Sequence, residues 1–198
     1  MKKQDLLNNI ADTAYNVGFG AKKHFATYDI VNKIPGVIGF ISLGVGIIAL
    51  SYDDFSTKLF STTVIILGII GLYISFYDTN KQSYDEKGKS LIQLFNELKK
   101  LFSIVDGLES LDDEKHIKKL RKIEKKYYKI SNSKQILFSG WYAHYKFFWE
   151  HQIDWLHEHK QFKLFRDKLP ISFTLFVVMS IIGLTIYFYK IQIKTMLC

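Results

Sequence analysis

Three stretches of this sequence contain no charged side chain, and each is long enough to cross a lipid bilayer as a helix. They cover residues 34–52, 59–77 and 169–189. At about 1.5 Å per residue, helices of this length span about 30 Å, the thickness of a bilayer's hydrocarbon core. Core helices of soluble proteins rarely run so far without a charge. We therefore predict an all-α integral membrane protein with a hairpin of two transmembrane helices and a third, C-terminal transmembrane helix.

These spans divide the chain into five predicted segments. They are an N-terminal cytoplasmic amphipathic helix (1–33), the transmembrane hairpin (34–77), a cytoplasmic helical stalk and bundle (78–168), the third transmembrane helix (169–189) and a short tail (190–198). The first span does not read as a cleavable signal peptide, because a mostly polar segment precedes it. The turn at 53–58 is short, so the two hairpin helices must be antiparallel neighbours.

The net charge of +8 is distributed in a way that predicts orientation. Lys and Arg number five before the first span, one in the hairpin turn, nineteen between the second and third spans and two after the third. Because cytoplasmic segments carry an excess of Lys and Arg, the N-terminus and residues 78–168 are predicted to be cytoplasmic. The hairpin turn and the C-terminus are then outside.

Helical periodicity continues outside the spans. Residues 4–32 show a three-four spacing of apolar side chains, and Pro35 is expected to begin the first span. The second span has no helix breaker at its inner end, so its helix is expected to continue as a stalk until Gly107. Two further helices are predicted, from about Ser110 to Ile130 and over 134–168, the second rich in aromatic residues.

Small residues recur on one face of each hairpin helix. They are Gly39, Ser42 and Gly46 in the first span, and Gly68, Gly71 and Ser75 in the second. Such faces allow backbones to approach closely, which helices in lipid need for association. They would serve for packing within the hairpin, for packing between subunits or for lining an opening, and the sequence does not choose between these uses.

The helix that ends at Ile130 is densely basic, with Lys118, Arg121, Lys122 and Lys125 among its eight cations. Three interpretations remain open: a solvated cytoplasmic face, binding to anionic lipid headgroups, and binding to a phosphate-bearing ligand or nucleic acid. No glycine-rich phosphate loop accompanies these residues, so direct nucleic-acid binding is not expected.

The aromatic region also carries several histidines. His151, Asp154 and Glu158 share one helical face, but they match no established metal motif, so we expect neither a metal nor another cofactor. No catalytic motif is present, so an enzyme is not expected. The three tryptophans fit either packing of the cytoplasmic bundle or a position at the lipid headgroups. The spans lack the charges that ion-coupled transporters use.

The run Thr13-Ala14-Tyr15-Asn16-Val17-Gly18-Phe19-Gly20-Ala21-Lys22-Lys23-His24-Phe25-Ala26-Thr27-Tyr28-Asp29-Ile30, followed by Ile34-Pro35-Gly36 and the hairpin, resembles the SLATT proteins. The name stands for SMODS and SLOG-associating two-transmembrane effector. The resemblance covers residues 5–165. It implies a membrane effector of prokaryotic antiviral defence in the bacterial inner membrane, encoded beside nucleotide-sensing or nucleotide-synthesising proteins. The third span departs from the two-span pattern of the family.

The resemblance implies a homo-oligomer that breaches the cell's own membrane on infection, an abortive-infection mechanism. We therefore expect a pore-forming effector or ion channel in contact with membrane lipids. Its trigger would be a cyclic nucleotide, a sensor protein or a change in membrane potential. The alternative is a membrane-anchored sensor or scaffold that binds anionic lipid or a partner protein without conducting.

Overall fold

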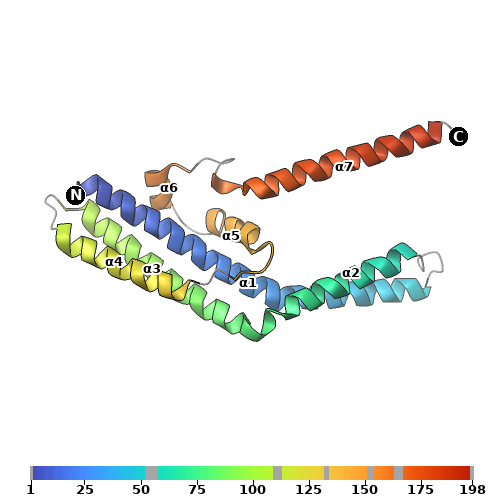
Figure 1. Cartoon of the computed structure of the whole chain (residues 1–198), viewed down its shortest axis with the longest axis horizontal. Helices are drawn as coiled ribbons and strands as arrows, with labels where there is room; N and C mark the ends of the chain where they lie inside the picture. Colours follow the sequence, from blue (N-terminus) through green and yellow to red (C-terminus); the bar gives the residue numbers. More distant parts are fainter. Residues whose placement is uncertain are drawn as a thin grey trace.

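The computed structural model describes residues 2–51, 58–108, 113–131, 134–150, 154–162 and 167–196, and none of these residues lies in a β-strand. The helices form two regions (Figure 1). One is a bundle around the N-terminal half of the first helix. The other consists of a helical hairpin and a separate C-terminal helix, both of which project from the same end of the bundle.

Helix α1 (Lys3–Ser51) is a single helix of 49 residues that joins the predicted amphipathic helix to the first span. Pro35 lies inside it, so our prediction that this proline begins a helix is wrong. Proline has no N–H, and the carbonyl of Val31 therefore lacks the usual partner four residues along. Membrane helices tolerate such a residue because neighbouring groups can satisfy the backbone.

The second span is α2 (Lys58–Ser75), which runs back along the membrane half of α1 and completes the predicted hairpin. A 3₁₀ turn, η2 (Asp78–Asn80), separates it from α3 (Lys81–Asp106). The prediction of an unbroken stalk helix is therefore wrong at this turn, although α3 ends just before Gly107 as expected. Asp, Thr and Asn have low helix propensity because their side chains compete for backbone hydrogen bonds, which favours a break here.

The bundle packs α3, α4 (Asp113–Ile130), α5 (Ser139–Phe148) and α6 (Asp154–Lys160) around α1. The expected single helix over 134–168 is wrong, because α5 and α6 are separate and Phe138 adopts a left-handed backbone conformation before α5. The predicted three-four pattern of α1 is confirmed where it meets α3. The buried core includes Leu7, Ile10, Ala14, Val17 and Ala21 of α1, Leu91, Leu94, Leu98, Leu101 and Val105 of α3, and Phe147 of α5.

Helix α7 (Ile171–Met196) stands apart from the hairpin in Figure 1. Trp141 of α5 contacts α7, because the indole N–H donates a hydrogen bond to the Ser172 hydroxyl at 3.0 Å and the ring packs on Phe173 and Phe176. Among the residues with described side chains, the apolar run of α7 covers Ile171–Ile186. The third span therefore stays a prediction.

Candidate functional site

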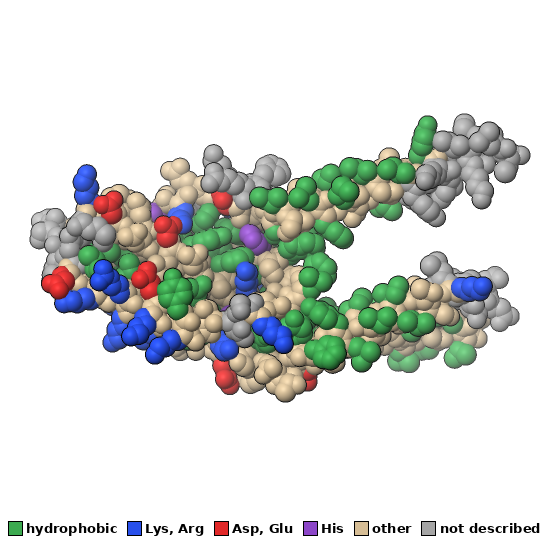
Figure 2. Space-filling model, viewed as in Figure 1, with side chains coloured by type: hydrophobic (Ala, Val, Ile, Leu, Met, Phe, Trp, Pro, Cys, Tyr) green, Lys and Arg blue, Asp and Glu red, His purple; other side chains and the backbone are tan. Residues whose placement is uncertain are grey.

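The hairpin exposes an apolar surface that water cannot solvate favourably. Phe40 is 79% exposed and Leu50 is 90% exposed, and many other large apolar side chains of α1 and α2 are also open. Both helices are long and apolar enough to cross a membrane. Figure 2 shows the same division over the molecule: Lys and Arg gather on the bundle, whereas apolar side chains cover the hairpin and α7. A surface of this size needs lipid or another protein against it.

The small residues of the hairpin do not form one packed face within a single copy. Ser42, Gly46 and Gly71 are partly buried, whereas Gly39, Gly68 and Ser75 are exposed. A Cβ atom added at any of the four glycines would meet no atom within 4 Å. Within one copy, therefore, open space remains beside these four glycines. Packing of α1 on α2 does not explain why these positions are glycine.

Residues 134–138, between α4 and α5, pack where the hairpin meets the bundle, and we call them the junction loop. Ile136 is buried against Val31 of α1 and Ile74 of α2, just before the 3₁₀ turn. This small core sits where the chain passes from the bundle to the membrane helices. Movement of α2 relative to α1 would therefore have to disturb Ile136.

Hydrogen bonds hold the junction loop on both sides. From the α2–α3 side, the Tyr84 hydroxyl donates to the Lys134 carbonyl at 2.9 Å, and the Tyr73 hydroxyl accepts from the Leu137 amide at 3.3 Å. From α1, the buried Thr27 hydroxyl donates to the Gln135 side-chain oxygen at 2.5 Å. The loop therefore ties α1 to the bend between α2 and α3.

An ion pair links α1 to α5 near the same level. Asp29 lies 2.8 Å from Lys146, and both side chains are only 16% exposed. Asp29 also pairs with Lys33 at 3.1 Å. Burial alone would raise the pKa of the Asp29 carboxyl, but hydrogen bonds from Lys146 and Lys33 outweigh it and hold the pKa below its ordinary value. Asp29 is therefore ionised at neutral pH and anchors α5 to α1.

The basic helix, α4, lies along the part of α1 that is distant from the membrane. Thr13 of α1 donates to the Glu124 carboxylate at 3.1 Å, and the Tyr127 ring is 3.5 Å from a Cβ placed on Gly20. Gly20 precedes the first uncharged span by fourteen residues, which is about 21 Å along a helix. Lys118, Arg121, Lys122 and Lys125 come before Tyr127, farther still from the span. This distance exceeds the Debye length, so α4 is badly placed to bind headgroups of its own membrane.

The aromatic and histidine residues are divided among several contacts. Trp155 packs on Phe95 and Phe102 in the bundle, whereas Trp149 is 61% exposed. His151 and the side chain of Asp154 lie outside the described residues. Elsewhere in the described chain, no three His, Cys, Asp or Glu side chains are grouped as metal ligands.

The polar cavity beside His24 was not predicted from the sequence. The periodicity placed His24 among the buried α1 residues, and it is indeed only 2% exposed. The sequence did not predict that Asn16, Lys23, Tyr127 and Ser131 surround a cavity beside it. These residues come from α1, α4 and the segment after α4, and no spacing rule connects residues so far apart in the chain.

These features define an all-helical membrane protein in which a transmembrane hairpin is continuous with a bundle of polar-faced helices. A family model described as SMODS and SLOG-associating 2TM effector domain 6 (SLATT_6) matches residues 1–177, so the chain belongs to this family. Membership implies a membrane effector of antiphage systems. No curated protein and no solved structure matches the chain.

Proposed function

We propose that several copies of this chain assemble in the bacterial inner membrane and open a pore through it when a defence system is triggered. The observation that supports this proposal is the open space beside the hairpin glycines. Within one copy nothing occupies it, although such faces let helices approach closely in lipid. A second hairpin fits this space chemically, because apolar and small residues surround it.

The proposed mechanism is a shift between a closed and an open packing of hairpins. A trigger can drive such a shift only if it binds the two states with different affinity. The junction loop is suited to transmit the shift, because it contacts α1, α2 and α3. We propose that the trigger, a cyclic nucleotide or a sensor protein, acts on the cytoplasmic bundle. No catalytic step is needed.

Assembly can be tested with Gly46→Leu and Gly71→Leu. A large side chain at either position should separate hairpins that need contact, so oligomer size and toxicity in cells should fall. Gly44→Leu is the matched control, because Gly44 also has open space around it but lies on the opposite side of α1 from the small-residue face. Unchanged oligomers in both test variants would contradict the packing argument.

Pore formation needs its own measurement. Purified protein in dye-loaded liposomes should release dye on addition of the trigger, and Gly46→Leu should reduce the release. If the wild-type protein kills cells but releases no dye under any trigger, the pore is excluded.

A second candidate function is a membrane-anchored sensor or scaffold, which the exposed cations of α4 favour. Reversal of charge at Lys118, Arg121, Lys122 and Lys125 would then abolish toxicity or signalling. Under the pore proposal, the same changes should leave dye release intact.

A further inference from the structure

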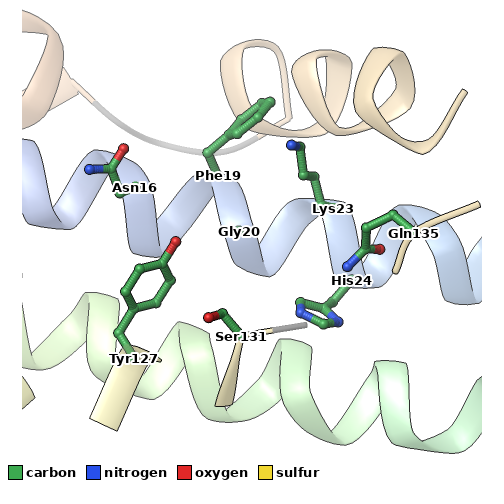
Figure 3. Close-up of a pocket in the computed structure, with 8 residues that line it drawn as sticks. All are labelled: Asn16, Phe19, Gly20, Lys23, His24, Tyr127, Ser131 and Gln135. Carbon is green, nitrogen blue, oxygen red and sulfur yellow. The ribbon is translucent and has the colours of Figure 1, made fainter. Parts of the chain in front are cut away.

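A polar cavity of about 370 Å³ lies between α1, the end of α4 and the junction loop. Figure 3 shows its lining: Asn16, Lys23 and His24 come from α1, Tyr127 and Ser131 from the end of α4 and the residue after it, and Gln135 from the junction loop. Its volume is at the lower end of the range for ligand pockets, so it has room for a small molecule.

Apart from Gln135, which accepts a hydrogen bond from Thr27, the polar side chains that line this cavity make no hydrogen bond among the described residues. Among the described residues, the side chains of Asn16, Tyr127 and Ser131 make no hydrogen bond, and Lys23 makes no ion pair, although its ammonium lies 5.2 Å from the Phe19 ring centre. Beside them, His24 is 2% exposed and its Nδ1 has no hydrogen-bond partner in the described part of the chain. Unpartnered buried polar atoms are uncommon, and a bound ligand is one explanation for them.

The charge of the lining determines which ligand it fits. None of the eight lining residues carries a carboxylate, and Lys23 is the cation among them. Asn16, Tyr127 and Ser131 can each donate a hydrogen bond to an oxygen atom. His24 adds no charge at neutral pH, because burial, and after it the nearby Lys87 ammonium, lowers its pKa to about 4. The site is therefore a set of donors with one positive charge.

We propose that this cavity binds a small soluble oxyanion, a phosphate ester or a carboxylate, with its charged group at Lys23. Hydrogen bonds from an ammonium to the oxygens of an anion are about twice as strong as hydrogen bonds between neutral groups. The Asn16, Tyr127 and Ser131 side chains bind the remaining polar atoms of the ligand, and His24 lines the same site.

The ligand comes from the cytoplasm rather than from a lipid headgroup. Lys23 precedes the uncharged span by eleven residues, or about 16 Å of helix. The polar layer on each side of a bilayer core is only about 5 to 8 Å thick. A headgroup of the protein's own membrane therefore does not reach the cavity.

The cavity adjoins the connection between bundle and hairpin. Gln135 lines it and also accepts the hydrogen bond from Thr27 that holds the junction loop to α1. A ligand that bonds to Gln135 changes that contact, which gives the site a route to the hairpin. This consequence for gating rests on the proposed function, whereas binding of the oxyanion does not.

The test uses the full-length protein in a neutral detergent. Sodium phosphate, glycerol 3-phosphate and citrate are titrated at constant ionic strength, with glycerol as the uncharged counterpart, and binding is measured by calorimetry. We expect at least one anion to bind with a Kd below about 1 mM and glycerol not to bind. Lys23→Gln should weaken that binding about ten-fold, and Tyr127→Phe about three-fold.

Two controls make the test decisive. Lys99→Gln removes one exposed cation of α3 away from the cavity and should leave the affinity within two-fold. Repeating the titration in nanodiscs that contain anionic phosphatidylglycerol should not change the Kd, because a headgroup does not compete. Absence of binding by all three anions, equal affinity in wild type and Lys23→Gln, or competition by the lipid would each overturn the proposal. Because no step measures conductance, these outcomes are independent of whether a pore forms.

Discussion

The two halves of α1 belong to one helix but meet different surroundings. Up to Val31, buried residues recur every three or four positions and face α3 and α5. From Asn32 to Ser51 no residue is fully buried, and the side chains are apolar on nearly every side. The first half is stabilised by contact with protein and therefore shows periodicity. The second half is solvated by lipid, so its sequence is constrained by the absence of charge rather than by a buried face.

The two regions also use glycine differently. A Cβ atom at Gly18 would lie 2.8 Å from the Phe95 ring, and one at Gly88 would lie 2.7 Å from Phe25. The hairpin glycines meet nothing within one copy. In the bundle, glycine is needed for contacts already present, whereas in the hairpin it leaves room for contacts that a single chain does not make.

The largest expected difference comes from removing one aromatic side chain in each region. Phe147 is completely buried, so Phe147→Ala should lower the free energy of unfolding by about 3 to 5 kcal/mol. Phe40→Ala removes a side chain that is 79% exposed and should cost less than about 0.5 kcal/mol in detergent. Thermal and denaturant unfolding of the purified variants measures both, and equal losses would show that the hairpin has a core of its own.

The next effect is a dependence of stability on pH that arises in the bundle. His24 has a folded-state pKa of about 4, against 6.5 in an unfolded chain, because it is buried and because Lys87 is near. The unfolded state then binds more protons below pH 6.5, so stability is complete above about pH 7 and falls as the pH falls toward 4. The loss at pH 5 should be at most about 2 kcal/mol.

The control for this pH dependence must take into account the other groups around His24. The Tyr84 ring of α3 packs on His24, the Lys87 ammonium acts on it electrostatically, and Lys23 and Tyr127 line the cavity beside it. A His24→Gln variant should flatten the stability profile between pH 7 and pH 5, measured by denaturant unfolding. His144, whose pKa is also lowered by burial and by Lys23, accounts for part of the remaining slope. An identical slope in the variant would contradict the assignment to His24.

A third comparison replaces one glycine of the bundle and one glycine of the hairpin by alanine, which adds a single methyl group at each position. Gly18→Ala forces a Cβ against the buried Phe95 and Phe147 rings, and overpacking of this kind should cost about 1 to 2 kcal/mol after the gain in helix propensity. Gly46→Ala meets open space and should leave the stability of one copy unchanged or slightly higher. Thermal unfolding of both variants checks this, and stabilisation by Gly18→Ala would show that the rings can move.

The sequence predicted the parts of this molecule that depend on composition or on regular spacing. Absence of charge located the hairpin, and three-four spacing located the contact between α1 and α3. Two of the three errors in the helices arose where periodicity continued through a break, at Asp78–Asn80 and between α5 and α6. The third is Pro35, which lies inside α1 instead of beginning a helix. At Asp78–Asn80 the low helix propensity of the residues favours the break, whereas α6 packs on α1 as a helix separate from α5.

Some features of the candidate site could be predicted from the sequence, and others could not. The small residues and cations were predicted one helix at a time, and their positions within those helices follow from the sequence. Whether Gly46 contacts a second copy depends on how copies assemble, and residue spacing within one helix does not determine that. The cavity beside His24 required residues from three segments to come together, and only the fold establishes that.

The smallest effect concerns the junction, where the two regions meet. Tyr84→Phe removes the hydroxyl that donates to the Lys134 carbonyl and should cost about 1 kcal/mol, the usual net value of one hydrogen bond. Tyr128→Phe is its control, because Tyr128 is 74% exposed and its hydroxyl has no hydrogen bond among the described residues. If the junction loop is what couples bundle and hairpin, amide exchange over 134–138 should accelerate in Tyr84→Phe, while exchange in α3 around Leu98 stays slow. Acceleration spread evenly through the bundle would show instead that this hydroxyl stabilises the whole fold and that the loop has no separate role.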